Sequence, residues 1–425
     1  MVEPLLEWAV RLQPRREETG PGPPPVPTRS HAIQNVTYLS TYAPHRCGIA
    51  TFTHDLAGSV GEHEIVALHP DGAPTNYPAE VRHRIRRDVP SDYLATARDL
   101  SSGPTSVVSI QHEYGIWGGP DGAWVLDFVR TLRKPTVATL HTVLRSPTPS
   151  QRRILAALVA ATTATVVMSE AAASLLARAY GVDPARLAII AHGVPDLPLV
   201  APDKVKPRLG LEGRTVILSF GLVGPGKGYE AAIAAMPAIV RAVPNALYVI
   251  LGATHPDLIR REGEAYRAML QATAASLGVT DSVRFVDRFV STSELGTWLQ
   301  AADIFVTPYP NLEQIVSGTL SYAMGAGKAI VSTPYAYAVE RLAHGRGVLA
   351  TPGSTDSLAA ALISVARDPG LRAALGRRAW EHSRSMVWPE VGAAYRRVFA
   401  RAAHAYPRSG QPLLVPSRKL VTVRG

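Results

Sequence analysis

Two series of short apolar segments, each alternating with helix-like sequence, constrain the fold of this chain more than any other feature. The first series supplies six segments of strand length: NVTYLS, EIVALH, TSVVSIQHE, PTVATLHT, ATVVMSE and LAIIAHGV. Such near-continuous apolar runs are typical of strands buried on both faces of a parallel sheet. Helical patterns such as ATFTHDLAGSV and PSQRRILAALVAA lie between several of them. The first series therefore predicts a doubly wound α/β domain.

The same alternation begins again after a proline-punctuated segment, 194–210, which we interpret as a linker. The second series of strands reads TVILSFG, ALYVILG, VRFVDRF, IFVTPY, AIVSTPY and GVLATP. We therefore predict two doubly wound domains, 33–198 and 199–385, facing each other across a cleft, and a last helix at 386–406. In such sheets ligands bind beyond the carboxyl ends of the strands, so we expect the functional residues in the loops that follow the strands.

The two ends of the chain and its single cysteine suggest a protein of a reducing compartment. Residues 1–32 contain acidic side chains, no long apolar core and the run PGPPPVP, so we expect a disordered leader and no signal peptide. Residues 407–425 read as a loose tail, and no stretch reaches the roughly 20 apolar residues of a membrane span. Cys47 alone excludes an intrachain disulfide and a multi-cysteine metal site. We expect a cytoplasmic location.

The net charge of +10 favours anionic partners, such as nucleic acid, a membrane surface or phosphorylated small molecules. The basic residues are spread along the chain except in VRHRIRRD, 81–88. No aromatic residues interleave with this cluster, which argues against nucleic acid. We interpret the cluster as a solvated charged surface, with contact to the inner face of an anionic membrane as the alternative.

Three loops of the first domain carry polar residues or glycine where this architecture would use them. Gly48 opens a helix and lets backbone approach an anion, and Arg46 beside it is either a phosphate partner or a solvated rim residue. His112 and Glu113 follow one buried strand, and His141 ends the strand 136–140. Ordinary glycine turns and structural hydrogen bonds are the alternatives, but the three loops converge on one edge of the sheet. We therefore predict ligand contacts for all five residues.

The loop SFGLVGPGKGYEAAI is the most informative of the second domain. The strand 215–220 leads into Gly221 and then into Lys227 at a helix start. The spacing is not that of a P-loop, because no Ser or Thr follows the lysine. A lysine beyond a glycine-rich bend can nevertheless meet a diphosphate with charge and backbone donors together. A lysine lying passively at a helix end is the alternative. Other catalytic signatures are missing from the sequence, including Gly-x-Ser-x-Gly and HExxH. We interpret His192, which lies at the junction of the two predicted domains, as part of a turn.

Read in order, these segments resemble the retaining glycosyltransferases of family 4, which have two Rossmann-like domains in the GT-B arrangement. The resemblance covers about residues 35–405 and rests on APHRCGIATFTHDL, QHEYGIWGG, TLHT, VVMSE, IIAHGV, GLVGPGKG, SELGTWLQAADIFVTPY, YAMGAGKAIVSTP and SMVWPEVGAAYRRVF. It implies transfer of a sugar from a nucleoside-diphosphate sugar to an acceptor hydroxyl with retention, without a metal or other cofactor. It also implies that the first domain takes the acceptor, that the second takes the donor, and that the helix 386–406 crosses back to the first domain.

The resemblance assigns roles to residues that match the family's motifs. Gly48 and Gly221 would lie near the donor, His141 would contact the donor sugar close to the reacting carbon, and Lys227 would neutralise the leaving diphosphate. In the small-residue segment SGTLSYAMGAGK, a helix start would hold the same phosphates on backbone N–H groups. The residues of this cradle are Ser317, Gly318, Thr319 and Leu320.

The sequence departs from the family's pattern at three positions. The family usually carries two glutamates separated by seven residues, and Gln314 and Tyr322 stand at those positions here. Glu313, one place away, is our candidate to replace the first glutamate. Leu222 replaces an arginine of the glycine-rich loop. We interpret the chain as a divergent subgroup that keeps donor contacts at Gln314 and Tyr322, and catalytic roles at His141, Lys227 and Glu313.

The leading hypothesis is a hexosyltransferase, with mannosyl and glucosyl transfer as candidates and a glycan, a lipid or a small molecule as acceptor. Arg46, His112 and Glu113 are the candidate contacts to the acceptor or the sugar. Two alternatives stay open: a sugar-nucleotide epimerase of the same fold, and a degenerate protein that binds the nucleotide sugar without chemistry. The lack of an obvious pair of acid–base carboxylates in the loops argues against the epimerase.

Overall fold

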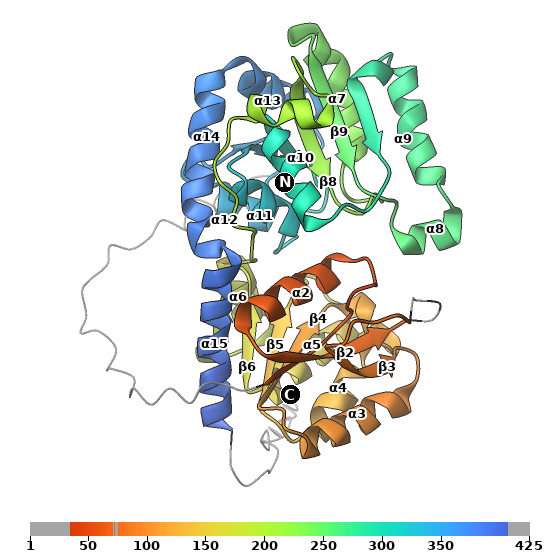
Figure 1. Ribbon diagram of the computed structural model, residues 1–425, viewed down its shortest axis with the longest axis vertical. Coiled ribbons are helices and arrows are strands. Elements are labelled where there is room, and N and C mark those ends of the chain that lie inside the picture. Colours follow the sequence, from red (N-terminus) through yellow and green to blue (C-terminus); the bar gives the residue numbers. More distant parts are fainter. Residues whose placement is uncertain (1–34, 71, 73–74, 407–425) are drawn as a thin grey trace, which may run out of the picture. The chain divides into compact units, whose positions relative to one another are not determined.

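The computed structural model describes residues 35–70, 72 and 75–406, and the predicted leader 1–32 and tail 407–425 lie outside this range. All described residues belong to one compact unit that contains two fully parallel sheets. Helices cover both faces of each sheet (Figure 1), which is the doubly wound α/β arrangement that the sequence predicts.

The first sheet has seven strands in the order β3-β2-β1-β4-β5-β6-β7. Its strands are β1 (Val36–Ser40), β2 (His63–His69), β3 (Val81–Arg86), β4 (Val107–His112), β5 (Thr136–Leu140), β6 (Ala164–Val167) and β7 (Leu187–Ile189). Its helices are α2 (Gly48–Val60), α3 (Pro90–Ser102), α4 (Val125–Thr131), α5 (Pro149–Ala161) and α6 (Glu170–Tyr180). Every residue of β1, β4 and β5 is buried, as expected of strands covered by helices on both faces.

The second sheet has six strands in the order β10-β9-β8-β11-β12-β13. Its strands are β8 (Thr215–Phe220), β9 (Ala246–Leu251), β10 (Val283–Val286), β11 (Ile304–Thr307), β12 (Ala329–Ser332) and β13 (Val348–Leu349). The helices of this part are α7 (Tyr229–Ala242), α8 (Pro256–Glu262), α9 (Ala265–Ser276), α10 (Thr292–Ala301), α11 (Gly318–Gly325), α12 (Ala336–Leu342), α13 (Thr355–Arg367) and α14 (Pro369–His382).

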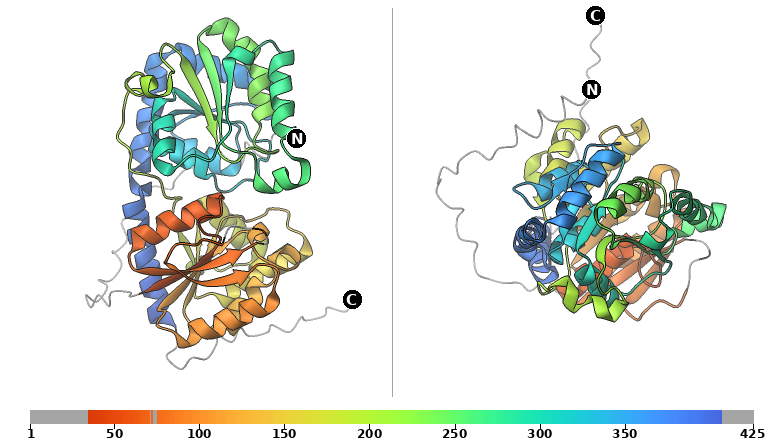
Figure 2. Two further views of the ribbon diagram at one scale, coloured as in Figure 1. Left: turned by 45° about the vertical axis from the view of Figure 1, so that its right-hand side comes forward. Right: turned by 90° about the horizontal axis from the view of Figure 1, so that it is seen from above.

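The last helix, α15 (Trp388–Ala405), packs on the first sheet and not on the second. Tyr395 shares a hydrogen bond of 3.1 Å with Thr139 of β5, and Arg396 donates to the carbonyl of Ser59 at the end of α2. A Cβ built on Gly392 would lie 2.5 Å from that same carbonyl, so a glycine lets the two helices approach closely. Figure 2 shows α15 running beside the first sheet.

The segment 194–210, which the sequence presents as a linker, is packed against the second sheet. Lys206 is 5% exposed, and its ammonium lies 2.9 Å from Asp303 and 2.7 Å from Asp203. Val194 is fully buried and pairs with Val387 in a short parallel bridge. The connection between the sheets is therefore held by specific contacts.

The charged run 81–88 forms the edge strand β3, which the apolar-run criterion misses. Arg82, Arg84 and Arg86 alternate along it with exposed side chains, while Ile85 is buried. Among the described strands, β3 pairs only with β2, and exposed charge on an edge strand discourages pairing with another chain.

Each sheet has one point at which the strand order reverses, between β1 and β4 in the first sheet and between β8 and β11 in the second. Ligands of doubly wound sheets bind at the carboxyl ends of the strands at this switch point. His112 is the last residue of β4 and Glu113 follows it, while Gly48 opens the helix after β1. Lys227 lies in the loop after β8, and Gly318 opens the helix after β11. These predicted site residues therefore lie at the carboxyl ends of the switch-point strands, whereas His141 follows the neighbouring strand β5.

Candidate functional site

The glycine-rich loop after β8 packs against the loop after β11. Gly228 has a φ of +74°, and a Cβ built on it would lie 2.0 Å from the carbonyl oxygen of Pro308. No other residue fits at this contact without moving the backbone. The contact fixes Lys227 next to the exit of β11, where its ammonium lies 4.7 Å from the centroid of the Tyr309 ring.

A chain of hydroxyl groups connects Tyr309 with the first turn of α11. The Tyr309 hydroxyl is 2.8 Å from the hydroxyl of Thr319, which is 3.2 Å from that of Ser317. Ser317 caps α11, because its side chain accepts a hydrogen bond from the N–H of Leu320. Gly221 joins the group from the other loop, since its Cβ would lie 3.6 Å from the Thr319 methyl group. The structure thus brings together Gly221, Lys227 and the helix start at 317–320.

This arrangement has the chemistry of an anion site. The first N–H groups of a helix have no partner within the helix, and the helix dipole favours negative charge there. In α11 the backbone N–H of Ser321 already bonds to the carbonyl of Ser317, so the N–H groups of Gly318 and Thr319 precede the regular pattern. An ammonium group, two hydroxyls and these amides together suit a phosphate or diphosphate.

His192 lies against the same helix start, although from the sequence we interpret it only as part of a turn. A Cβ built on Gly318 would meet His192 Nε2 at 2.8 Å, so only glycine fits beside the ring without a shift. His192 Nδ1 donates to the carbonyl of Gly193 at 2.8 Å, which leaves Nε2 as an acceptor. Burial lowers the pKa of His192 to about 4, against the raising effect of the bond to Gly193. The ring is therefore neutral at pH 7.

On the first sheet, His141 is held in one orientation at the end of β5. Its Nε2 donates to Gln111 Oε1 at 2.9 Å, and the Phe52 ring meets it edge-on with centroids 4.8 Å apart. Burial, with smaller contributions from the nearby His192 and His112, lowers the pKa of His141 to about 3. His141 is therefore neutral at pH 7, with Nδ1 left as an acceptor. Phe52 also meets the His192 ring at 5.1 Å, so one phenyl group connects both histidines.

His112 and Glu113 have different surroundings. His112 is fully buried, neither ring nitrogen has a hydrogen-bond partner among the described residues, and burial lowers its pKa to about 4. Glu113 accepts a short hydrogen bond from Thr142, the residue after His141. Burial raises the pKa of Glu113, while the hydrogen bonds from Thr142 and from the N–H of Tyr114 lower it. Glu113 thus lies with His141, whereas His112 points into the interior.

Arg46 and Gly48 are exposed at the start of α2. The Arg46 guanidinium lies 5.8 Å from the centroid of the Phe289 ring, and a Cβ on Gly48 would meet nothing within 4 Å. There is space for a ligand at Gly48, but no contact within the protein requires a glycine at this position.

The residues predicted to stand in for the two family glutamates have partners of their own. Gln314 donates to the carbonyl of Val316, and the exposed Glu313 lies 4.0 Å from Arg145. The Tyr322 hydroxyl donates to Asp55 of α2 at 3.0 Å, and the tyrosine is 6% exposed. Burial raises the pKa of both members of this pair. Each of these three residues therefore has a contact within the protein.

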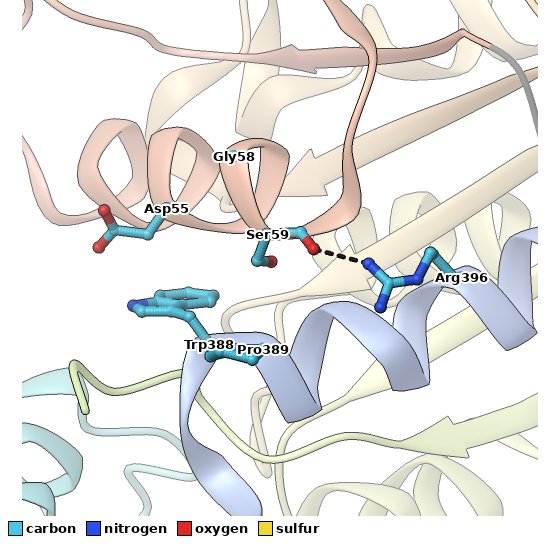
Figure 3. Close-up of a pocket in the computed structure, with 6 residues that line it drawn as sticks. All are labelled: Asp55, Gly58, Ser59, Trp388, Pro389 and Arg396. Carbon is cyan, nitrogen blue, oxygen red and sulfur yellow. Dashed lines mark hydrogen bonds between the residues drawn. The ribbon is translucent and has the colours of Figure 1, made fainter.

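A cavity of about 480 Å³ lies elsewhere, between the end of α2 and the start of α15 (Figure 3). It is lined by Asp55, Gly58, Ser59, Trp388, Pro389 and Arg396. None of the predicted site residues lines it, so it is not the site that the loops form. Within residues 35–70, 72 and 75–406, no three side chains of His, Cys, Asp or Glu lie together in a way that could hold a metal ion. In the same ranges no helix has the length and apolar character needed to cross a membrane.

Comparison with protein families gives a match for each sheet. The model for Glycosyltransferase Family 4 matches residues 47–196, and the model for Glycosyl transferases group 1 matches residues 203–382. The first match covers the loops with Gly48, His112 and His141, and the second covers Lys227 and the start of α11.

Curated relatives are distant and match only part of the chain. The D-inositol 3-phosphate glycosyltransferase of Streptomyces bingchenggensis is 26% identical over 298 residues, which are 65% of this chain and 63% of the relative. The phosphatidyl-myo-inositol mannosyltransferase of Mycolicibacterium smegmatis is 28% identical over 195 residues, 46% of this chain and 47% of the relative. The chain thus spans about half to two thirds of the length of these relatives.

Among solved structures, Anabaena HepE in complex with UDP superposes with a TM-score of 0.71 at 16% identity. The superposition covers 86% of this chain and 100% of that chain, and at this identity it establishes the fold. The chain is therefore a two-domain protein of the GT-B fold, whose first domain is similar to the Glycosyltransferase Family 4 model and whose second domain is similar to the Glycosyl transferases group 1 model.

Proposed function

We propose that the protein is a glycosyltransferase that moves a sugar from a nucleoside-diphosphate sugar to an acceptor hydroxyl. One observation carries the proposal: Lys227 lies over Tyr309, whose hydroxyl reaches Thr319 in the first turn of α11. This site offers a cation and backbone donors to a strongly anionic group, and a nucleoside diphosphate is such a group.

The geometry suits a reaction in which the diphosphate leaves. As the bond between the sugar and the diphosphate breaks, negative charge grows on the leaving oxygen. Lys227 and the N–H groups of Gly318 and Thr319 stabilise that charge where it develops. The N–H of Leu320, which the sequence also predicts as a donor, bonds to the side chain of Ser317. His141 Nδ1, an unprotonated acceptor, receives a hydrogen bond from a hydroxyl group of the donor sugar and orients it. The remaining predicted contacts are Gly48, Gly221 and Ser317 to the donor, and Arg46 and Glu113 to the acceptor or the sugar. His112, also predicted as such a contact, is fully buried and is not part of the proposed site.

The printed functions of the relatives guide the choice of substrates. They include an inositol-phosphate glycosyltransferase and a mannosyltransferase, and the HepE structure contains UDP. We propose transfer of a hexose, mannose or glucose, with retention of configuration and without a metal, to a glycan, lipid or small-molecule hydroxyl. A cytoplasmic location and peripheral contact with the inner face of a membrane stay predictions.

The first test measures turnover directly. Pure protein is incubated with UDP-, GDP- and ADP-linked hexoses, with and without inositol 3-phosphate, phosphatidylinositol and simple glycans, and the release of nucleoside diphosphate is measured. We expect release that depends on both donor and acceptor and that EDTA does not change. An anomeric NMR spectrum of the product, compared with that of the donor, tests retention.

Matched variants connect turnover with the site. Lys227→Ala is expected to lower the rate about a hundredfold, which corresponds to about 2.7 kcal/mol. Lys204→Ala, at an exposed lysine of the segment between the sheets, is the control for the loss of one positive charge. Conversion of donors without an acceptor would identify an epimerase, donor binding without transfer would identify a binding protein, and no binding to any donor would refute the proposal.

A further inference from the structure

We propose that Tyr309 is a positioning residue that prepares the diphosphate site before the ligand arrives. Its ring holds the Lys227 ammonium and its hydroxyl holds Thr319, so that one buried side chain sets both halves of the site. The inference rests on the proposed function and adds a residue that acts through Lys227 and Thr319.

Tyr309 is itself held firmly. It is 4% exposed, and its ring stacks on that of Tyr335 with centroids 5.2 Å apart and an angle of 17° between the planes. Its carbonyl accepts a hydrogen bond of 2.6 Å from Thr333. The preceding residue, Pro308, carries the carbonyl on which Gly228 packs. The ring therefore has a fixed position relative to the loop that carries Lys227.

The ring keeps the charge of Lys227 available. Among the described residues no carboxylate lies within 4.0 Å of this ammonium, whereas Lys206 has two carboxylate partners. A carboxylate would compete with a diphosphate for the charge, but an aromatic face attracts the cation without neutralising it. A free lysine side chain carries about 2 kcal/mol of rotamer entropy. Because the Tyr309 ring already holds the lysine side chain in place, less side-chain entropy is lost when a ligand binds.

The hydroxyl of Tyr309 orients the other half of the site. It is 2.8 Å from Thr319 Oγ1, which is 3.2 Å from Ser317 Oγ, and Ser317 caps the helix through the N–H of Leu320. These bonds fix the first turn of α11, whose N–H groups would face the phosphates. Loss of the hydroxyl alone should therefore loosen the helix start and leave the ring beneath Lys227 unchanged.

A double-mutant cycle tests the ring. UDP, GDP and ADP are titrated by calorimetry into the wild type, Tyr309→Leu, Lys227→Ala and the double variant, and the tightest wild-type ligand is used throughout. We expect Tyr309→Leu to weaken binding about five- to tenfold in the wild-type background and less than twofold in the Lys227→Ala background. A purely structural role predicts the same factor in both backgrounds, and that result would overturn the inference.

A second cycle tests the hydroxyl with variants that keep the ring. Tyr309→Phe should weaken binding about two- to threefold and should add nothing to Thr319→Val, and full additivity would overturn this half. If Tyr309→Leu does not fold, as judged by its thermal transition, the second cycle decides alone. A wild type that binds no nucleoside diphosphate overturns the proposed function together with this inference. If the wild type binds a nucleoside diphosphate but the effects of the paired substitutions are additive in both cycles, only the role of Tyr309 is overturned.

Discussion

Replacing Gly228 by alanine tests the contact that fixes the two loops of the candidate site. The alanine would adopt a φ of +74°, which costs about 1 kcal/mol for a residue with a Cβ. Its Cβ would also lie 2.0 Å from Pro308 O, far inside van der Waals contact, and a backbone atom must move to relieve the clash. Overpacking of this kind costs about 1–3 kcal/mol. The sum predicts a loss of about 2–4 kcal/mol in the free energy of unfolding.

Gly226→Ala is the matched control in the same loop. Gly226 has a φ of +86°, but nothing lies within 4 Å of its Cβ position, so only the backbone cost of about 1 kcal/mol applies. Urea unfolding measures the loss of unfolding free energy in both variants, provided that the dependence of this free energy on urea concentration is the same as in the wild type. Gly228→Ala should also weaken nucleotide binding more than Gly226→Ala, because the clash pushes Lys227 away from the exit of β11. Equal losses of stability in the two variants would refute the close approach of the loops.

Two further predictions concern buried charge. Asp303→Ala should cost about 3–4 kcal/mol in urea unfolding, because it removes the buried one of the two carboxylate partners of Lys206 and the acceptor of the Val216 N–H. A loss below about 1 kcal/mol would contradict this. For His112, burial lowers the folded-state pKa from 6.5 to about 4. Between these two pH values the unfolded state binds a proton at this residue and the folded state does not, so the free energy of unfolding falls as the pH falls. His112→Phe should reduce the slope of the free energy of unfolding against pH by up to about 1.4 kcal/mol per pH unit, relative to the wild type. Chemical denaturation between about pH 4.5 and 6 measures this slope, and equal slopes in the two proteins would contradict the prediction.

The doubly wound fold could be predicted because its strands are buried on both faces. The predicted strands 136–140 and 215–220 agree with the bounds of β5 and β8. β3 was missed, since an edge strand needs no continuous apolar run and here alternates arginine with other residues. The packing of the segment 194–210 could not be read from its prolines, because the partner of Lys206 is Asp303, far away in the sequence.

The candidate site was predictable where local sequence carries the signal. Glycines next to Lys227, and small residues at a helix start, mark places where backbone can approach a ligand. Tyr309 and His192 were missed because their importance depends on contacts across the fold, to Lys227 in one case and to Gly318 in the other. The partner of Tyr322 is Asp55, 267 positions away, and no local pattern reveals such a bond.

The central claim is that Lys227 and the start of α11 hold a diphosphate together. The most direct test is calorimetric titration of the wild type and Lys227→Ala with UDP and with uridine, which lacks the diphosphate. Both proteins should bind uridine with the same low affinity. In the wild type, UDP should bind more tightly than uridine, and the ratio of the two dissociation constants should fall at least tenfold in Lys227→Ala. An unchanged preference for UDP in Lys227→Ala would contradict the claim.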